Sequence, residues 1–390
     1  MIWRTIFQIV PVLAWLVSFL VVVSPLGLSR RRALLVTAVL GLAFGKFAFF
    51  AVVGGNSFTP NLPQLVIWTY GWIYGAAMLL TMLAFFASLF DGAASALRHP
   101  VPLLVKRIRC AVFALFAVAV SFWGIYEGVR IPSVNRVEIV CPGLPAAFDG
   151  YRIVHLSDLH CSTAARRGRF ERIVERVNAL KPDLVAITGD FVDGTVANRR
   201  GDLAPLAGLV AKDGVLGCTG NHERYWEWKR WRVALKGMGI VFPEESGVYV
   251  IRRGGDALAV GGLVDCAFSN YCNAVEAFVG APKGAFRILL FHRPYTQTIA
   301  SAAGDVSLQL SGHTHGGAMP GLRTLVEYTN EGKSRGLYEF APGRYLHLSA
   351  GTGQWAGFPL RFFVPAEISE LVLRTGGKGA EGVSPRKAAP

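Results

Sequence analysis

The chain has 390 residues, 52% of them hydrophobic, and its mean hydropathy of +0.39 argues against a protein that lies wholly in water. Its formal net charge is +14, and more than half of this excess falls in residues 1–130, which carry 10 Lys and Arg against 2 Asp and Glu. Basic residues concentrated in the most apolar third of the chain give no reason to expect a specific nucleic-acid partner.

Four apolar runs, at about residues 5–28, 33–53, 65–90 and 110–129, dominate the first third of the chain. Each is close to the ~20 residues that a helix needs to cross the hydrocarbon layer of a membrane. The first run is too long for the apolar core of a signal peptide, and no Ala-x-Ala cleavage site follows it, so we expect it to be retained. The pattern predicts a transmembrane domain of about four helices over residues 1–130.

The loops between these runs differ in charge, and the difference predicts an orientation. Residues 30–32 are all arginine and residues 98–109 contain several basic side chains, whereas residues 54–64 carry no charge. Basic loops stay in the cytoplasm. We therefore expect a multi-pass protein of the inner (plasma) membrane whose residues after 130 lie outside the cytoplasm, although Arg4 points weakly the other way. Lys46, inside the second run, marks either a transport path or a lysine packed in the bundle.

From about Ile131 the pattern changes to short apolar runs that alternate with amphipathic ones. The runs YRIVHLS, DLVAIT, GVLGCT, FRILLF and VSLQLS are each typical of a buried strand. Between the first two, residues 169–183 place apolar side chains on one helical stripe. Strand, helix and strand in this order predict an α/β domain over residues 131–374. Residues 375–390 are small, polar and rich in Pro and Gly, which predicts a disordered tail.

A polar cluster follows each of the five predicted strands. The clusters are Ser157-Asp158-Leu159-His160, Gly189-Asp190, Gly220-Asn221-His222-Glu223, His292-Arg293-Pro294 and Gly312-His313-Thr314-His315. In open α/β sheets the loops at the C-terminal ends of the strands converge on one crevice, where ligands bind. We therefore expect these clusters to form a single site.

Two carboxylates, one carboxamide and up to five imidazoles would meet in that crevice. Oxygen and imidazole donors without thiolates suit Mn²⁺, Fe or Zn²⁺. There are more donor side chains than one ion takes from a protein, but their number suits two ions that share a carboxylate. Glycines at 189, 220 and 312 allow the sharp turns that bring these side chains together.

The order Asp-x-His, Gly-Asp-x-x-Asp, Gly-Asn-His-Glu, His, Gly-His-x-His resembles the calcineurin-like metallophosphoesterase superfamily. The stretches LPAAFDGYRIVHLSDLH, GHTHGG and FPLRFFVPAEISELVL are similar to its bacterial membrane-anchored branch. The resemblance covers about residues 131–374 and includes every metal motif. It implies a four-layer α-β-β-α sandwich of two mixed sheets flanked by helices, here preceded by the transmembrane bundle.

The resemblance also implies a role for each residue of the motifs. One divalent ion would be held by Asp158, His160, Asp190 and His315, and the second by Asp190, Asn221, His292 and His313. Asp190 would bridge the two ions and also serve catalysis, and His222 would stand free beside the phosphate as a catalytic residue. Manganese is the preferred metal, with iron, zinc or magnesium as alternatives.

Three further residues leave alternatives open. Arg335, in GKSRG, is a candidate for contact with the substrate phosphate. Asp265, in GGLVDC, either lines the site or forms a turn. Cys161 follows the first motif directly, where a small or apolar residue is expected, and a thiol there could disturb metal choice or become oxidised.

The sequence therefore predicts a membrane-anchored phosphoesterase with two metal ions. It would hydrolyse phosphodiester or pyrophosphate bonds by in-line attack of a metal-bridging hydroxide. An alternative is a hydrolase dedicated to one lipid-linked phosphate or nucleotide-sugar lipid. An alternative of another class is a channel or transporter with a regulatory soluble domain, which is disfavoured because Lys46 is the one charge deep in the predicted helices.

Overall fold

The structure is a computed structural model that describes residues 2–265, 274–296, 306–318 and 323–376, with side chains from residue 9 onward. Residues 377–390 of the predicted tail lie outside this range. The chain forms two compact units. Unit 1 comprises residues 1–128 and 356–362, and unit 2 comprises residues 129–355 and 363–390. The chain thus passes from unit 2 into unit 1 for seven residues near its C-terminal end and then returns.

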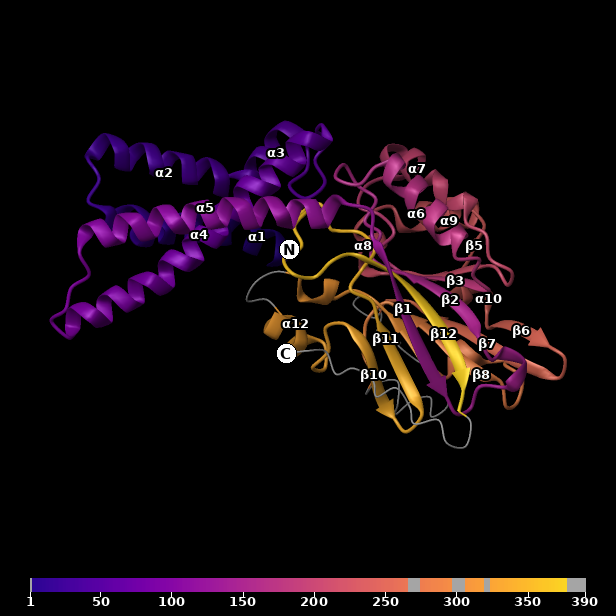
Figure 1. Cartoon of the computed structure of the whole chain (residues 1–390). Coiled ribbons are helices and arrows are strands. Elements are labelled where there is room, and N and C mark those ends of the chain that lie inside the picture. Colours follow the sequence, from indigo (N-terminus) through magenta and orange to yellow (C-terminus); the bar gives the residue numbers. More distant parts are fainter. Residues whose placement is uncertain (1, 266–273, 297–305, 319–322, 377–390) are drawn as a thin grey trace. The chain divides into compact units, whose positions relative to one another are not determined.

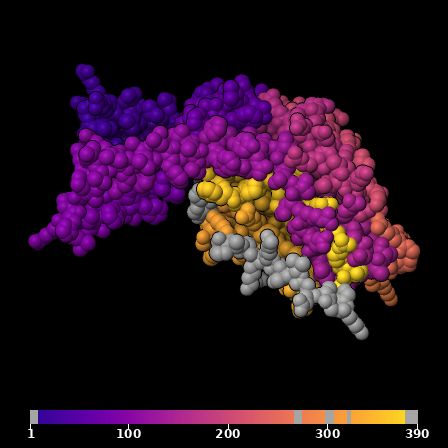
Figure 2. Space-filling model, viewed as in Figure 1, coloured from indigo at the N-terminus to yellow at the C-terminus, as the bar shows by residue number. Residues whose placement is uncertain are grey.

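Unit 1 is built from apolar helices, coloured indigo to purple in Figures 1 and 2. They are α1 (Ile2–Ser18), which continues through η1 (Phe19–Val23) and η2 (Ser24–Leu26), then α2 (Arg30–Phe44), α3 (Lys46–Gly54), α4 (Gln64–Ala96) and α5 (Leu103–Val129). In the described residues, three segments are long and apolar enough to cross a membrane, at 9–26, 64–96 and 103–129. Helices α2 and α3 form a bent pair with an angle of 58° at Gly45, which would be a fourth span. These helices indicate a membrane protein.

The segment 356–362 packs into unit 1 against glycines of α4 and α5, and a Cβ atom on Gly128 of α5 would lie 2.7 Å from the carbonyl oxygen of Pro359. A Cβ atom on Gly71 of α4 would lie 2.6 Å from Pro359 Cγ, and one on Gly75 would lie 2.7 Å from Leu360 Cδ1. Gly71 and Gly75 are four residues apart, which is the spacing of small residues that lets membrane helices approach closely. Here the same spacing makes room for the non-helical segment 356–362.

Lys46 is buried in this unit and has partners there. Its Nζ donates a 2.5 Å hydrogen bond to the carbonyl of Gly357 and lies 4.7–5.1 Å from the ring centroids of Phe47, Tyr74 and Phe358. A carbonyl and aromatic faces together stabilise a cation away from water. These contacts favour the interpretation of Lys46 as a lysine packed in the bundle.

Unit 2 contains two six-stranded mixed sheets. The first has the order β1-β12-β2-β3-β4-β5 and the second β10-β11-β9-β8-β7-β6. The strands are β1 (Ser133–Cys141), β2 (Tyr151–Leu156), β3 (Leu184–Thr188), β4 (Val215–Cys218), β5 (Ile240–Val241), β6 (Tyr249–Arg253), β7 (Asp256–Leu263), β8 (Phe286–Phe291), β9 (Leu308–Ser311), β10 (Gly336–Ala341), β11 (Arg344–Leu348) and β12 (Glu367–Thr375). Strands β2, β3, β4 and β5 run parallel, as do β7, β8, β9 and β11, while β12 is antiparallel to β2. In Figure 2 the yellow atoms of β12 lie beside those of β1, with which it pairs.

Alternate residues along the strands enter different cores. Ile153 of β2 packs between the sheets with Val260 of β7 and Ile288 of β8. Its neighbour Val154 faces the opposite way and packs under the helices of the first sheet's outer face with Phe170. The inner strands are thus buried on both faces, which explains why they read as continuous apolar runs.

The helices and short turns of unit 2 lie around the two sheets (Figure 1). They are η3 (Ala146–Phe148), α6 (Arg167–Ala179), α7 (Val196–Leu203), η4 (Ala204–Gly208), α8 (Asn221–Tyr225), α9 (Trp228–Lys236), α10 (Pro243–Ser246), η6 (Glu276–Phe278), η7 (His315–Gly317) and α12 (Arg323–Thr329). The predicted apolar stripe of α6 is buried against the first sheet. The predicted sandwich of two mixed sheets flanked by helices is confirmed.

Candidate metal centre

The five polar clusters lie in unit 2 at the C-terminal ends of β2, β3, β4, β8 and β9. The first three strands belong to one sheet and the last two to the other. Because the strands within each set are parallel neighbours, their loops leave the same edge of each sheet. The structure brings all seven predicted metal ligands to this place, and their role as ligands stays a prediction.

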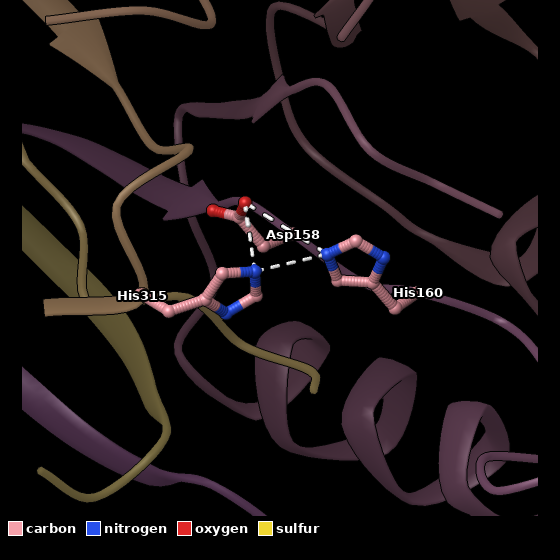
Figure 3. Close-up of side chains that lie close together, drawn as sticks. All are labelled: Asp158, His160 and His315. Carbon is pink, nitrogen blue, oxygen red and sulfur yellow. Dashed lines mark hydrogen bonds and ion pairs between the residues drawn. The ribbon is translucent and has the colours of Figure 1, made fainter. Parts of the chain in front are cut away.

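Asp158, His160 and His315 form the first cluster (Figure 3). The Nε2 atoms of the two histidines are 3.1 Å apart, and Asp158 Oδ1 lies 3.6 Å from that of His315 and 4.0 Å from that of His160. Asp158 and His160 are fully buried, while the His315 side chain is 20% exposed. Two nitrogens that bind one Zn²⁺ at about 2.0–2.1 Å in tetrahedral geometry stand roughly 3.3 Å apart, so this spacing suits a shared ion.

Asp190, His292 and His313 form the second cluster, and Asp190 connects it to the first. Its Oδ2 lies 3.2 Å from His292 Nε2 and 3.7 Å from His160 Nε2, and His292 Nε2 lies 3.3 Å from His313 Nδ1. A single carboxylate oxygen therefore stands between ligand atoms of both clusters. This is the position that a carboxylate shared by two ions would occupy.

Asn221 contributes a side-chain oxygen whose partner is not found among the described residues. Its Oδ1 is buried and makes no hydrogen bond to any described residue, whereas its Nδ2 lies 3.3 Å from the hydroxyl of Tyr225. A buried carbonyl oxygen without a partner costs free energy unless something else binds it. The residues present therefore fit the pair of divalent ions that the donor set implies.

Hydrogen bonds on the far side of the rings orient two of the predicted ligands. His160 Nδ1 lies 3.0 Å from Asp193 Oδ2, and His292 Nδ1 lies 2.7 Å from the carbonyl of Thr188. Each acceptor fixes the ring proton on Nδ1 and leaves Nε2 free to bind a cation. This arrangement is typical of histidines that ligate metals.

Asp193 also contacts His222, and the sequence analysis assigned it no role. Its Oδ1 lies 2.5 Å from His222 Nδ1, while His222 Nε2 lies 3.9 Å from Asp190 Oδ2. Burial lowers the pKa of His222, but Asp190 and Asp193 outweigh that effect and raise the pKa to about 9. Asp193 thus holds a cationic imidazole at the edge of the site. In the sequence, Asp193 could have been noticed as the last residue of the Gly-Asp-x-x-Asp motif.

Glu223 is the second residue whose role was missed. Its carboxylate accepts hydrogen bonds from the backbone N–H groups of Gly220, Asp190, Phe191 and Val192, at 2.6–3.3 Å. Burial, together with the charge of Asp190, raises the pKa of Glu223 to about 7. The carboxylate joins the loop after β3 to the loop after β4, so it shapes the site without belonging to either cluster.

Burial and neighbouring charges act in opposite directions on the pKa values of the cluster residues. Burial raises the pKa of Asp158. The pKa of Asp190 lies well below its usual value because His292 and His222 outweigh the opposing effect of burial. Burial lowers the pKa of His292, but the negative charge of Asp190 outweighs this effect and raises the pKa to about 10. Cations that enter the site would compete with protons for these groups.

The backbone around the site is strained. Among the described residues, nine that are not glycine have a positive φ, and five of them belong to the clusters, namely Asp158, His160, Asp190, His313 and His315. Such conformations persist where the surrounding structure enforces them, and they gather at functional sites. Gly312 allows the closest approach, because a Cβ atom there would lie 1.8 Å from Ser157 Oγ.

Three other predicted residues have different surroundings. Arg335 lies beside the loop of His315, because its Cδ is 3.1 Å from where a Cβ of Gly316 would stand. Asp265 is buried and ion-paired with Arg293, which lies at the rim of the second cluster. Cys161 is fully buried, and burial raises the pKa of its thiol well above the usual value, so it is not a reactive thiolate.

Comparison with known proteins agrees with this geometry. Residues 151–317 match the model of a family described as calcineurin-like phosphoesterase. An uncharacterized metallophosphoesterase of Aquifex aeolicus is 30% identical over 262 residues, which cover 63% of this chain and 92% of that protein. A zebrafish (Danio rerio) transmembrane protein with a metallophosphoesterase domain is 33% identical over 277 residues, or 68% of this chain.

The likeness has limits in length and in structure. The chain spans 63% of the length of the zebrafish relative and of a bovine (Bos taurus) transmembrane protein of the same description, which is 29% identical over 68% of this chain. Among solved structures, the anchor protein GAP50 of the Plasmodium inner membrane complex matches with 13% identity and a TM-score of 0.34. That match covers 56% of this chain and 79% of GAP50, and it is too distant to support an argument.

Proposed function

Since the chain belongs to the calcineurin-like metallophosphoesterase family, we propose that it is a membrane-anchored enzyme that hydrolyses phosphodiester or pyrophosphate bonds with two metal ions. The observation that carries the proposal is the position of Asp190 Oδ2, which lies 3.2 Å from His292 Nε2 and 3.7 Å from His160 Nε2. The unpartnered oxygen of Asn221 supports it.

The two clusters and Asn221 supply the proposed ligands. One ion would be held by Asp158, His160, Asp190 and His315, and the other by Asp190, Asn221, His292 and His313. Two divalent ions bound here would lower the pKa of a water between them and neutralise phosphate oxygens. Donors of this kind accept manganese, iron, zinc or magnesium, and we propose manganese as the preferred ion.

His222 and Asp193 would handle the leaving group. His222 carries a proton on a ring that Asp193 holds through a 2.5 Å contact with Nδ1, so Nε2 is the atom directed to the substrate. A protonated imidazole at this position can donate its proton to the departing oxygen. We propose Arg335 as a further contact for the phosphate, because it adjoins the loop of His315.

A lipid-linked phosphate is the second candidate substrate. The Trp355 ring centroid lies 6.1 Å from that of His222 in unit 2, and the next seven residues of the chain belong to the apolar unit 1. Trp355 is therefore followed directly in sequence by a segment that belongs to the membrane part. Incubation of a membrane lipid extract with the enzyme and with a metal-ligand variant, compared by mass spectrometry, would identify such a substrate.

The full-length protein in detergent is the material for the test of the main proposal. We expect metal-free protein to be inactive on bis-p-nitrophenyl phosphate, and expect added Mn²⁺ to restore hydrolysis together with about two bound ions per chain, measured by elemental analysis. The monoester p-nitrophenyl phosphate, included for comparison, should be cleaved more slowly. Full activity in the presence of a strong chelator would contradict the metal mechanism.

The orientation in the membrane is a separate prediction. Residues 30–32 and the segment 98–109 hold the basic loop residues of the membrane part, so we expect both to lie in the cytoplasm and unit 2 to lie outside it. Alkaline phosphatase fused after residue 135 should then be active, and green fluorescent protein fused there should not fluoresce. The reverse pattern would place the catalytic unit in the cytoplasm.

A further inference from the structure

Arg293 follows His292 directly, at the end of β8, and reaches the rim of the second cluster. Its Nε donates to both carboxylate oxygens of Asp265, at 3.1 and 2.9 Å, and Asp265 is fully buried. Its Nη1 lies 3.2 Å from His313 Nε2 and 3.4 Å from the hydroxyl of Tyr295. Asp265 therefore holds the Nε side of the guanidinium, and Nη1 faces His313, a proposed metal ligand.

The contact between Arg293 and His313 depends on where the imidazole carries its proton. A guanidinium can only donate hydrogen bonds, so His313 Nε2 must accept and the ring proton must be on Nδ1. Nδ1 is, however, the atom that faces the second cluster, 3.3 Å from His292 Nε2. An imidazole that binds a cation through Nδ1 carries its proton on Nε2, where it would meet the N–H of Arg293. Cation binding and this hydrogen bond exclude each other.

An arginine that loses this acceptor needs another one nearby. Asp265 holds Nε and keeps the guanidinium in place, while Nη2 has no hydrogen-bond partner among the described residues. The Arg293 side chain is 14% exposed, so part of it is open to solvent. Two parallel N–H donors in a fixed plane match two phosphate oxygens, which makes arginine the preferred residue for phosphate recognition.

We propose that Arg293 is a substrate-binding residue, which turns from His313 to the non-bridging phosphate oxygens of the substrate once the second cluster holds its cation. The inference rests on the proposed function and deepens it, because it assigns the binding of the anionic phosphoryl group to Arg293, which the sequence placed in a polar cluster without a role. Asp265 acts as the positioning residue that holds the guanidinium at the site.

Binding of inorganic phosphate is the direct test, since it requires no turnover. In full-length protein loaded with Mn²⁺, we expect Arg293→Met to raise the calorimetric Kd for phosphate about tenfold or more, the size expected for lost hydrogen bonds to a charged group. The KM for bis-p-nitrophenyl phosphate should rise by a similar factor and kcat should change less. Elemental analysis should still find the wild-type content of metal.

Two further variants make the test decisive. Arg287→Met is the matched control, because Arg287 lies on β8, the strand that leads to Arg293, with its guanidinium 5.4 Å from the centroid of the Phe278 ring, and this variant should bind phosphate like the wild type. Loss of the cation beside buried Asp265 can destabilise the fold, so the double variant Arg293→Met/Asp265→Asn removes both charges.

The outcomes separate this inference from the proposed function. Wild-type phosphate affinity in a folded Arg293 variant that retains its metals would overturn the inference. A loss of bound metal would do the same, because Arg293 would then support His313 instead of the substrate. Phosphate binding that depends on Arg293 in a protein that hydrolyses no ester would uphold the inference and overturn the proposed function.

Discussion

Replacement of Asp190 by asparagine should abolish metal-dependent hydrolysis. The carboxylate oxygen lies between the two clusters, and the substitution removes the negative charge that both ions would share. Metal ions contribute several kcal/mol to catalysis of this kind, and a loss of about 4 kcal/mol corresponds to roughly a 10³-fold lower rate. Asparagine keeps the size of the side chain and can still accept the 2.9 Å hydrogen bond from the backbone N–H of His222, so the fold should survive.

Activity on bis-p-nitrophenyl phosphate and metal content by elemental analysis are the measurements. Asp183→Asn is the matched control, because Asp183 is also buried but accepts hydrogen bonds from Lys212 and from the backbone of Arg152, away from the clusters. We expect that control to lose stability and keep its metals. An Asp190→Asn protein with wild-type activity and two bound ions would remove the shared carboxylate from the mechanism.

The His222→Ala variant should keep both ions and lose rate in a manner that depends on the leaving group. The proton that His222 carries matters when a basic alkoxide departs and matters little for nitrophenolate. General acid catalysis typically contributes about 10²–10⁴-fold, so we expect a loss in that range with a dialkyl phosphodiester, in which the P–O bond to an alkoxide breaks, and a much smaller loss with bis-p-nitrophenyl phosphate. The ratio of the two losses is the quantity to measure.

Asp193→Asn provides the companion measurement. Asp193 contacts Nδ1 of both His160 and His222, so its loss should lower the rate through the orientation of His222 and weaken one metal ligand. Equal losses on both esters in His222→Ala would indicate electrostatic stabilisation instead of proton donation. Loss of a metal ion from His222→Ala would make His222 a ligand and overturn its assignment.

Much of the fold could be predicted because the inner strands carry a strong local signal. Strands such as β2, β3 and β8 are buried on both faces, and their continuous apolar runs are visible without tertiary information. The break of the second apolar run at Gly45 was missed, since hydropathy measures the length of a span and not its straightness. The entry of residues 356–362 into unit 1 was also unexpected, because that segment was read as part of the soluble domain.

The predicted site followed from one regularity, which is that polar clusters at the ends of parallel strands meet at one edge. This regularity brought together Asp158, Asp190 and His313 without knowledge of any distance. It could not assign Asp193 and Glu223, since a carboxylate that holds a ligand or a loop looks the same in sequence as one in a turn. Their roles appear only as contacts, such as the four backbone N–H groups that Glu223 accepts.

The order of residues along the chain already specifies the apolar spans, the alternation of strands and helices, and the chemical identity of the donors, because each depends on neighbours within about 20 residues. Tertiary structure decides which atoms of those donors face one another. The imidazoles that lie 3.1 Å apart in the first cluster are separated by 155 residues in sequence, and Lys46 and its acceptor Gly357 are separated by 311. Local patterns carry no information about such distant pairs, so the position of Asp190 between the two clusters and the contact of Arg293 with His313 emerge only from the folded chain.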